Sequence, residues 1–290
     1  MHPLRLTIRS SELTPERLLD YAKEVLRESG DLTVEAVSDG VWLKGADEQR
    51  MYSVAIDMRK RLGASVEIGG LSIQYRETVT RSVEVEGKWI KQSGGRGQYG
   101  HVWIRMERAE EGKGIAFSNR IVQEVVPKVF IPAVEEGVRE ALRTGPIAGY
   151  PVTDIEVSLF DGSYHDIDST EDAFKQAAII ACKTALAKCA PVLLEPIMFV
   201  EVTTPEEGVG NVVADLSGRR GLITGMEDVA SGMLVRVEVP LVEMLGYASE
   251  LAELTDAKGT SSFKFSHYAK APSPQGPDDD EPASMALRVA

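Results

Sequence analysis

The stretch LRLTIRSSELTPERLLDYAKEVLRESG, residues 4–30, predicts the first strand and helix of a two-layer domain. Its opening half, residues 4–9, alternates apolar and polar side chains, which is typical of a half-buried strand. Thr14 and Pro15 stand where a helix N-cap and first helical residue are expected. An apolar stripe with helical spacing follows, and Gly30 marks the end of the helix. This stretch therefore predicts a strand followed by a helix that covers one face of a sheet.

The sequence after Gly30 completes a βαββαβ order, which is that of a ferredoxin-like domain. Two short β-rich runs, a second amphipathic helix that stops at Gly63 and further extended residues fill positions 32–76. The same order returns near the C-terminus, over residues 196–268. We therefore predict an α+β protein in which two ferredoxin-like domains, 1–76 and 196–268, flank a middle domain of different design, 77–195.

The middle segment contains a long predicted hairpin, residues 82–91 and 99–108, and two helices separated by a strand. The second helix is rich in alanine. Asp168 and Glu171 have the spacing of a capping box, so Asp168 is predicted to cap that helix. The last residues, 269–290, have no core pattern and are predicted to form a disordered acidic tail.

The bulk composition excludes several classes of protein. The 290 residues carry a formal net charge of -13, so indiscriminate binding to nucleic acid is not expected and any RNA contact must be local. No membrane span or signal peptide is evident, which predicts a cytoplasmic protein. The two cysteines, Cys182 and Cys189, are predicted to be reduced and buried, because seven residues of helix separate them too far for a disulfide.

The hairpin is turned by IKQSGGRGQYGHV, residues 90–102, a basic glycine-rich loop in an acidic chain. Residues 95–100 match the dinucleotide fingerprint G-x-G-x-x-G, but a β-rich run follows where the fingerprint requires a helix. No P-loop occurs in the chain either, so we expect no nucleotide cofactor and no GTPase activity. From the residues alone, a flexible hairpin turn remains the alternative.

A second loop, SYHDIDS at residues 163–169, also carries potential chemistry. His165 with Asp166 and Asp168 could bind a metal ion, or could serve a nucleophilic Ser163 or Ser169. Against both hypotheses, Asp168 is already explained as a helix cap, and neighbours in a strand-to-helix turn rarely converge on one metal. We expect no metal site and no catalytic residue.

Several longer stretches make the sequence similar to a known family. KQSGGRGQYGHV, AGYPVTDIEVSLFDGSYHDIDSTEDAFKQAA, APVLLEPIMFVEVTTPEE, DLSGRRGLITGME and VPLVEMLGYASELAELT resemble the C-terminal half of bacterial elongation factor G, in order and without large gaps. The resemblance implies domain III for 1–76, domain IV for 77–195 and domain V for 196–268. It also implies that the middle domain is ribosomal-protein-S5-domain-2-like, and that the family's GTPase domain and domain II are missing.

The resemblance implies that two loops of the middle domain form a tip that enters the decoding centre of the small ribosomal subunit. There the tip would contact the tRNA–mRNA duplex, and a segment of the last domain would lie near the factor-binding site of the large subunit. The residues expected to bind RNA are Lys91, Gln92, Ser93, Gly94, Gly95, Arg96, Gly97, Gln98, His165, Asp166, Arg219 and Arg220.

Two departures from the family pattern weaken the expected contacts elsewhere. The G-M-G-E-L-H-L motif of domain III is replaced by residues 45–51, GADEQRM, and Ala252 and Glu253 stand where an arginine and a serine are usual. The first hypothesis is a monomeric, ribosome-binding translation factor without GTPase activity. The alternatives are a regulator that competes with full-length elongation factor G, a protein-interaction module that has left the ribosome, and an enzyme that uses His165.

Overall fold

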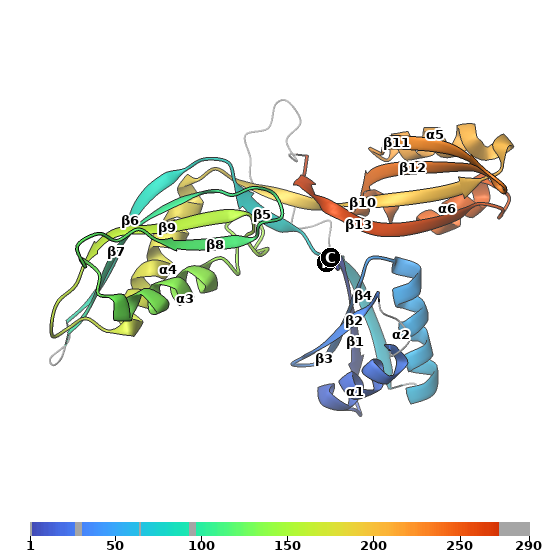
Figure 1. The fold of residues 1–290 in the computed structure, drawn as a ribbon. Coiled ribbons are helices and arrows are strands. Elements are labelled where there is room, and N and C mark those ends of the chain that lie inside the picture. Colours follow the sequence, from blue (N-terminus) through green and yellow to red (C-terminus); the bar gives the residue numbers. More distant parts are fainter. Residues whose placement is uncertain (1, 27–30, 64, 93–96, 273–290) are drawn as a thin grey trace, which may run out of the picture. The chain divides into compact units, whose positions relative to one another are not determined.

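The computed structural model describes residues 2–26, 31–63, 65–92 and 97–272. The chain divides into two compact units. Among the described residues, one comprises those up to Gln74 with Glu195–Ala269, and the other comprises Tyr75–Leu194 with Lys270 and the two residues after it. The predicted α+β class is confirmed, because helices and largely antiparallel sheets occur together in each part of the chain (Figure 1).

The N-terminal sheet has the strand order β2-β3-β1-β4 and belongs to a ferredoxin-like βαββαβ domain, as predicted. Its elements are β1 (Leu4–Ser10), α1 (Pro15–Val25), β2 (Thr33–Val37), β3 (Gly40–Gly45), α2 (Glu48–Leu62) and β4 (Val66–Ile73). Thr14 caps α1 as expected, since its side-chain oxygen accepts a hydrogen bond from the Arg17 N–H. Alternate residues of β1 are fully buried, which places the helices on one face of this sheet.

The C-terminal sheet repeats the same topology with the order β11-β12-β10-β13. Its elements are β10 (Pro191–Thr204), α5 (Val209–Gly218), β11 (Leu222–Val229), β12 (Gly232–Pro240), α6 (Tyr247–Leu254) and β13 (Thr260–Lys270), with 3-10 turns η3 (Glu206–Gly208) and η4 (Leu241–Met244). The apolar spacing of residues 241–254 predicts one continuous helix, and that prediction is wrong. Gly246 adopts a left-handed conformation (φ 75°) and separates η4 from α6.

The middle sheet has the order β6-β7-β9-β8, and α3 and α4 cover one of its faces (Figure 1). Its elements are β6 (Val83–Lys91), β7 (Gln98–Arg108), β8 (Ile115–Asn119), α3 (Ile131–Ala141), β9 (Ile155–Ser163) and α4 (Glu171–Lys188), with η2 (Lys128–Phe130) before α3. A short strand, β5 (Arg76–Val79), pairs with the first residues of β10.

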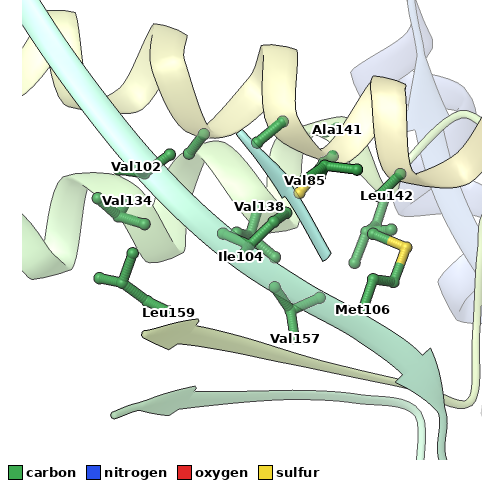
Figure 2. Packing of buried hydrophobic residues seen from close by; sticks show 14 of the residues in the cluster. Val85, Val102, Ile104, Met106, Val134, Val138, Ala141, Leu142, Val157 and Leu159 are labelled. Atoms are coloured by element: carbon green, nitrogen blue, oxygen red, sulfur yellow. The ribbon is translucent and has the colours of Figure 1, made fainter. Parts of the chain in front are cut away.

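The core of the middle domain lies between this sheet and its two helices. Figure 2 shows Val102, Ile104 and Met106 of β7 beside Val134 and other apolar residues of α3. Burying one such side chain contributes about 1.5–3 kcal/mol to stability, so this layer fixes the hairpin against the helices. Both cysteines are free and buried in this core, as predicted.

The hairpin and α4 approach each other closely enough to exclude side chains. A Cβ atom at Gly87 would lie 2.2 Å from the carbonyl oxygen of Ala177, and one at Gly100 would lie 2.2 Å from that of Ala173. Such distances are sterically forbidden, so glycine is required at both positions of the hairpin. At these two positions the backbone of the hairpin therefore packs directly against the backbone of α4.

β13 continues to Lys270, two residues into the segment predicted as a tail. The residues from 273 to the C-terminus, where the rest of that tail is predicted, lie outside the described part of the chain. Within the described residues no helix is long and apolar enough to cross a membrane.

Candidate nucleic-acid interface

The glycine-rich loop is held by two strands that stay paired until the loop begins. Ile90 pairs with Tyr99, and Lys91 pairs with Gln98 as the last rung of the ladder. The connection therefore spans residues 92–97. Of the predicted site residues, Ser93, Gly94, Gly95 and Arg96 lie outside the described residues.

The second loop, residues 164–170, lies against the base of the first. The Asp168 carboxylate accepts a hydrogen bond from the Gly97 N–H (3.1 Å), and the Asp168 carbonyl accepts one from the Tyr99 N–H (2.9 Å). The Ser169 hydroxyl donates to the Tyr99 carbonyl (3.0 Å). The expectation that the two loops lie together at one end of the middle domain is therefore confirmed for their described parts.

These contacts correct the prediction that Asp168 caps the helix. The N-cap of α4 is Thr170, whose side-chain oxygen accepts from the Ala173 N–H (3.2 Å), and the helix begins at Glu171. The Asp168 carboxylate is instead directed at Gly97, where a Cβ atom would come within 3.0 Å of the carboxyl carbon. The capping-box spacing was misleading because Asp168 bridges two loops that are distant in sequence.

His165 projects from the second loop on an ordered local turn. Its backbone N–H donates to the Ser169 hydroxyl (2.9 Å), and its Nδ1 accepts from the N–H groups of Ile167 and Asp168 (3.3 Å each). The Asp168 carboxylate also lies 3.5 Å from this Nδ1. These contacts hold the imidazole ring in a set orientation, and the side chain, which is 54% exposed, presents its other nitrogen at the tip.

Lys91 and Gln98 are held at the end of the hairpin by Trp89. The Lys91 ammonium lies 4.3 Å from the centre of the Trp89 ring, and the Trp89 Nε1–H donates to the Gln98 side-chain oxygen (3.0 Å). Gln92 and Asp166 are exposed. Asp166 is the predicted site residue whose charge opposes phosphate, so its contribution has to come from hydrogen bonding to bases or hydroxyl groups.

A chain of polar side chains next to the tip escaped the sequence analysis. The Ser163 hydroxyl lies 2.7 Å from the Tyr99 hydroxyl and 2.7 Å from His101 Nδ1, and His101 Nε2 lies 3.0 Å from Glu86 Oε1. Hydrogen bonding from Lys88, with a smaller contribution from His101, lowers the pKa of Glu86. The alternation of QYGHV, which puts Tyr99 and His101 on one face of β7, was the available signal.

Of the two serines in the triad hypothesis, Ser163 contacts His101, whereas the Ser169 hydroxyl accepts from the backbone N–H of His165. His165, Asp166 and Asp168 also form no metal site, because no group of three histidine, cysteine or carboxylate side chains among the described residues is arranged to hold an ion. The described part of the tip thus presents polar groups on an ordered turn, which is suited to hydrogen bonding with a ligand.

Arg219 and Arg220 belong to the C-terminal domain, at the end of α5, and both have carboxylate partners. Arg219 pairs with Asp215 (2.8 Å) and Glu250, and stacks on Tyr247 at 5.1 Å. Its side chain is only 16% exposed.

Arg220 makes two parallel hydrogen bonds to the buried Glu195 carboxylate (2.8 and 3.0 Å) and a third to Glu243 (3.0 Å). These bonds, led by that to Glu195, raise the pKa of Arg220. Both arginines thus contribute to the structure of the domain, whatever they also bind.

Comparisons with known proteins agree on one family. Residues 72–190 match the family model described as elongation factor G, domain IV, and residues 192–276 match the one described as elongation factor G C-terminus. A crystal structure of a protein from Thermus thermophilus is similar, with a TM-score of 0.76 and 38% sequence identity. The similarity covers 93% of this chain and 41% of that one, so the chain spans about two fifths of the length of its solved relative.

Proposed function

Because the chain belongs to the elongation factor G family, matching its C-terminal half, we propose that it binds the ribosome through the tip of its middle domain. The tip, defined here as residues 91–98 and 164–168, contacts the tRNA–mRNA duplex in the decoding centre of the small subunit. It acts there in translocation, and the C-terminal domain contacts the factor-binding site of the large subunit. The isolated chain has no enzymatic activity of its own and needs no cofactor.

The observation that carries this proposal is the bridging of the two loops by Asp168. Three hydrogen bonds join the described bases of the two loops, and such preorganisation reduces the entropy lost on binding. His165, Lys91 and Gln98 are all oriented by neighbours at this end of the sheet. Fixed donors of mixed type suit the backbone and minor-groove edges of an RNA duplex.

The test is co-sedimentation of the chain with 70S ribosomes, combined with chemical footprinting of the small-subunit RNA. We expect protection of decoding-centre nucleotides by the wild-type chain. Asp168→Ala removes the bridge and should weaken both sedimentation and protection. The matched control is Asp228→Ala, which removes an exposed carboxylate of β11 in the C-terminal domain.

Three outcomes distinguish the alternatives. If the chain does not sediment with ribosomes, the result supports the alternative of a protein-interaction module that no longer binds the ribosome. If the Asp168→Ala variant sediments and protects the decoding centre as well as the wild type, binding occurs in another way than through the bridged tip. A chain that binds and displaces elongation factor G without supporting translocation is a competing regulator.

A further inference from the structure

The N-terminal sheet has one face without a helix from its own domain. Leu4, Leu6 and Ile8 of β1 are fully buried beneath α1 and α2. The intervening residues, Arg5, Thr7 and Arg9, therefore lie on the opposite face, since successive side chains of a strand alternate. We call this surface of β1–β4 the open face.

The centre of the open face is a tryptophan between two cations. Trp42 of β3 pairs with Thr7 of β1, and the next rung on the same face pairs Lys44 with Arg5. The guanidinium carbon of Arg5 lies 4.2 Å from the centre of the Trp42 ring, and the Lys44 ammonium lies 5.6 Å from it. The ring and the guanidinium plane together offer a stacking surface on the two central strands of the sheet.

The charges around this ring are not equally satisfied. Lys44 pairs with Glu35, whereas the Arg5 Nε–H donates to the Ser72 hydroxyl (3.2 Å), a neutral partner. Among the described residues no carboxylate lies within ion-pair distance of Arg5. Arg5 thus holds a positive charge against Trp42 that an anion can still neutralise.

The open face is also low and polar next to this ring. Gly69 of β4 lies beside Thr7, so β4 adds no side chain to the face at this position. None of the large, exposed apolar side chains of the described residues belongs to β1–β4. A face with one aromatic ring and no aliphatic patch does not favour a protein partner, because such interfaces have an apolar core.

We propose that the open face binds single-stranded RNA, with one base stacked over Trp42 and Arg5 and an adjacent phosphate at Arg5. Trp42 is half-buried on this face, and four-stranded sheets with aromatic side chains on their central strands stack bases in this way. A single strand is required because the bases of a duplex are already stacked on one another. This site is separate from the tip, and goes beyond the proposed function.

The experiment measures fluorescence anisotropy of a labelled uridine oligonucleotide of about eight nucleotides, the size of a small single-strand site, with the full chain. We expect saturable binding that a duplex of equal length does not show. Trp42→Ala should raise Kd at least about fivefold, the lower limit for losing one stacked base, while Trp42→Phe should keep most of the affinity. Trp103→Ala, in the sheet of the middle domain, is the control with the same substitution.

Arg5→Gln provides a second variant should Trp42→Ala fail to fold by circular dichroism. It should weaken binding and reduce the slope of log Kd against log salt by about 0.7, the value for one phosphate contact on a single strand. The proposal is overturned by absence of saturable binding up to about 100 μM protein, the weak limit of non-specific contacts. It is equally overturned if Trp42→Ala and Arg5→Gln bind like the wild type.

Variants of the tip separate this proposal from the preceding one. Arg96→Ala and His165→Ala should leave the affinity for the oligonucleotide unchanged. If they abolish it while Trp42→Ala does not, the RNA binds the tip and the open face is not a site. A wild-type chain that binds the oligonucleotide but does not sediment with ribosomes would contradict the proposed function alone.

Discussion

At the scale of single residues, Asp168 is the residue on which the tip most depends. Its carboxylate and carbonyl both accept backbone N–H groups from the glycine-rich loop, at Gly97 and Tyr99. A carboxylate that accepts a backbone N–H forms a charge-assisted bond, which is stronger than a neutral one. Thr170, two residues later, performs the separate task of capping α4.

Asp168→Ala and Thr170→Ala should therefore have different local effects. Each is expected to lower the free energy of unfolding by about 1–2 kcal/mol, the first by losing a charge-assisted bond and the second by losing a helix cap. Hydrogen exchange monitored by NMR distinguishes them. Asp168→Ala should expose the Gly97 amide and leave the Ala173 amide protected, and Thr170→Ala should do the reverse. The opposite pattern would restore Asp168 as the cap.

Cys182 makes a prediction about pH. Burial raises the pKa of this thiol to about 12 from its ordinary value of 9.0. The folded state therefore keeps the thiol protonated up to a higher pH than the unfolded state does. The contribution of the buried thiol to folding stability is complete below about pH 9 and is lost as pH rises from there toward 12.

Urea titrations between pH 8 and pH 11 cover the range in which the thiol of the unfolded state loses its proton. The free energy of unfolding should fall across this range, and the fall should be smaller for Cys182→Ala than for the wild type. An equal fall in both proteins would mean that Cys182 does not contribute to it. The variant also creates a small cavity, so the comparison rests on the change with pH and not on the absolute stability.

At the scale of elements, the end of α5 is fixed by ion pairs that the sequence did not reveal. Arg220→Ala would leave the Glu195 carboxylate buried without its partner, and such a change costs more than the pair contributes. We expect the free energy of unfolding to fall by at least about 2 kcal/mol. The double variant Arg220→Ala, Glu195→Gln should recover part of the loss, as measured by urea unfolding.

Ribosome sedimentation of the same variants examines the other role predicted for Arg220. If this arginine contacts ribosomal RNA, Glu195→Gln alone should strengthen binding, because it removes one of the two carboxylates that pair with the guanidinium group. Unchanged binding in both single variants would limit Arg220 to its structural role.

The elements themselves were largely predictable, because hydrophobic alternation and helix caps are local. Thr14, Pro15 and the flanking strands were enough to predict β1 and α1. The exceptions have non-local causes. Gly246 breaks a segment whose apolar spacing still suggests one helix. The Asp168 carboxylate does not cap α4 but accepts a hydrogen bond from the amide of Gly97, 71 residues away in sequence. His101 was missed because its partners, Ser163 and Glu86, come from two other strands.

At the scale of the whole molecule, the net charge of -13 determines how binding must respond to salt. The electrostatic field of the negatively charged chain repels RNA, so the affinity for the ribosome depends on a small number of local contacts. We expect ribosome binding to weaken only modestly with salt, and Arg96→Ala to flatten the log–log slope by about one unit. A salt series of co-sedimentation measures this, with circular dichroism as the folding control. Identical slopes would place Arg96 outside the interface.

We also expect the purified chain neither to bind nor to hydrolyse GTP. The only glycine-rich fingerprint, at residues 95–100, opens into β7 and supplies no helix N-terminus for a phosphate. Isothermal titration calorimetry with GTP should show no heat of binding. Micromolar affinity would contradict this and would require a nucleotide site of another kind.

The contact of Gly87 and Gly100 with α4 has a mechanical consequence. A load on the tip reaches the rest of the middle domain through β6 and β7, and these strands rest on the helix backbone at Ala177 and Ala173. Side chains absorb force by changing rotamer, but at Gly87 and Gly100 the hairpin has no side chain between its backbone and the helix. We therefore expect a force applied to the tip to reach α4 at these two positions with little displacement lost in between.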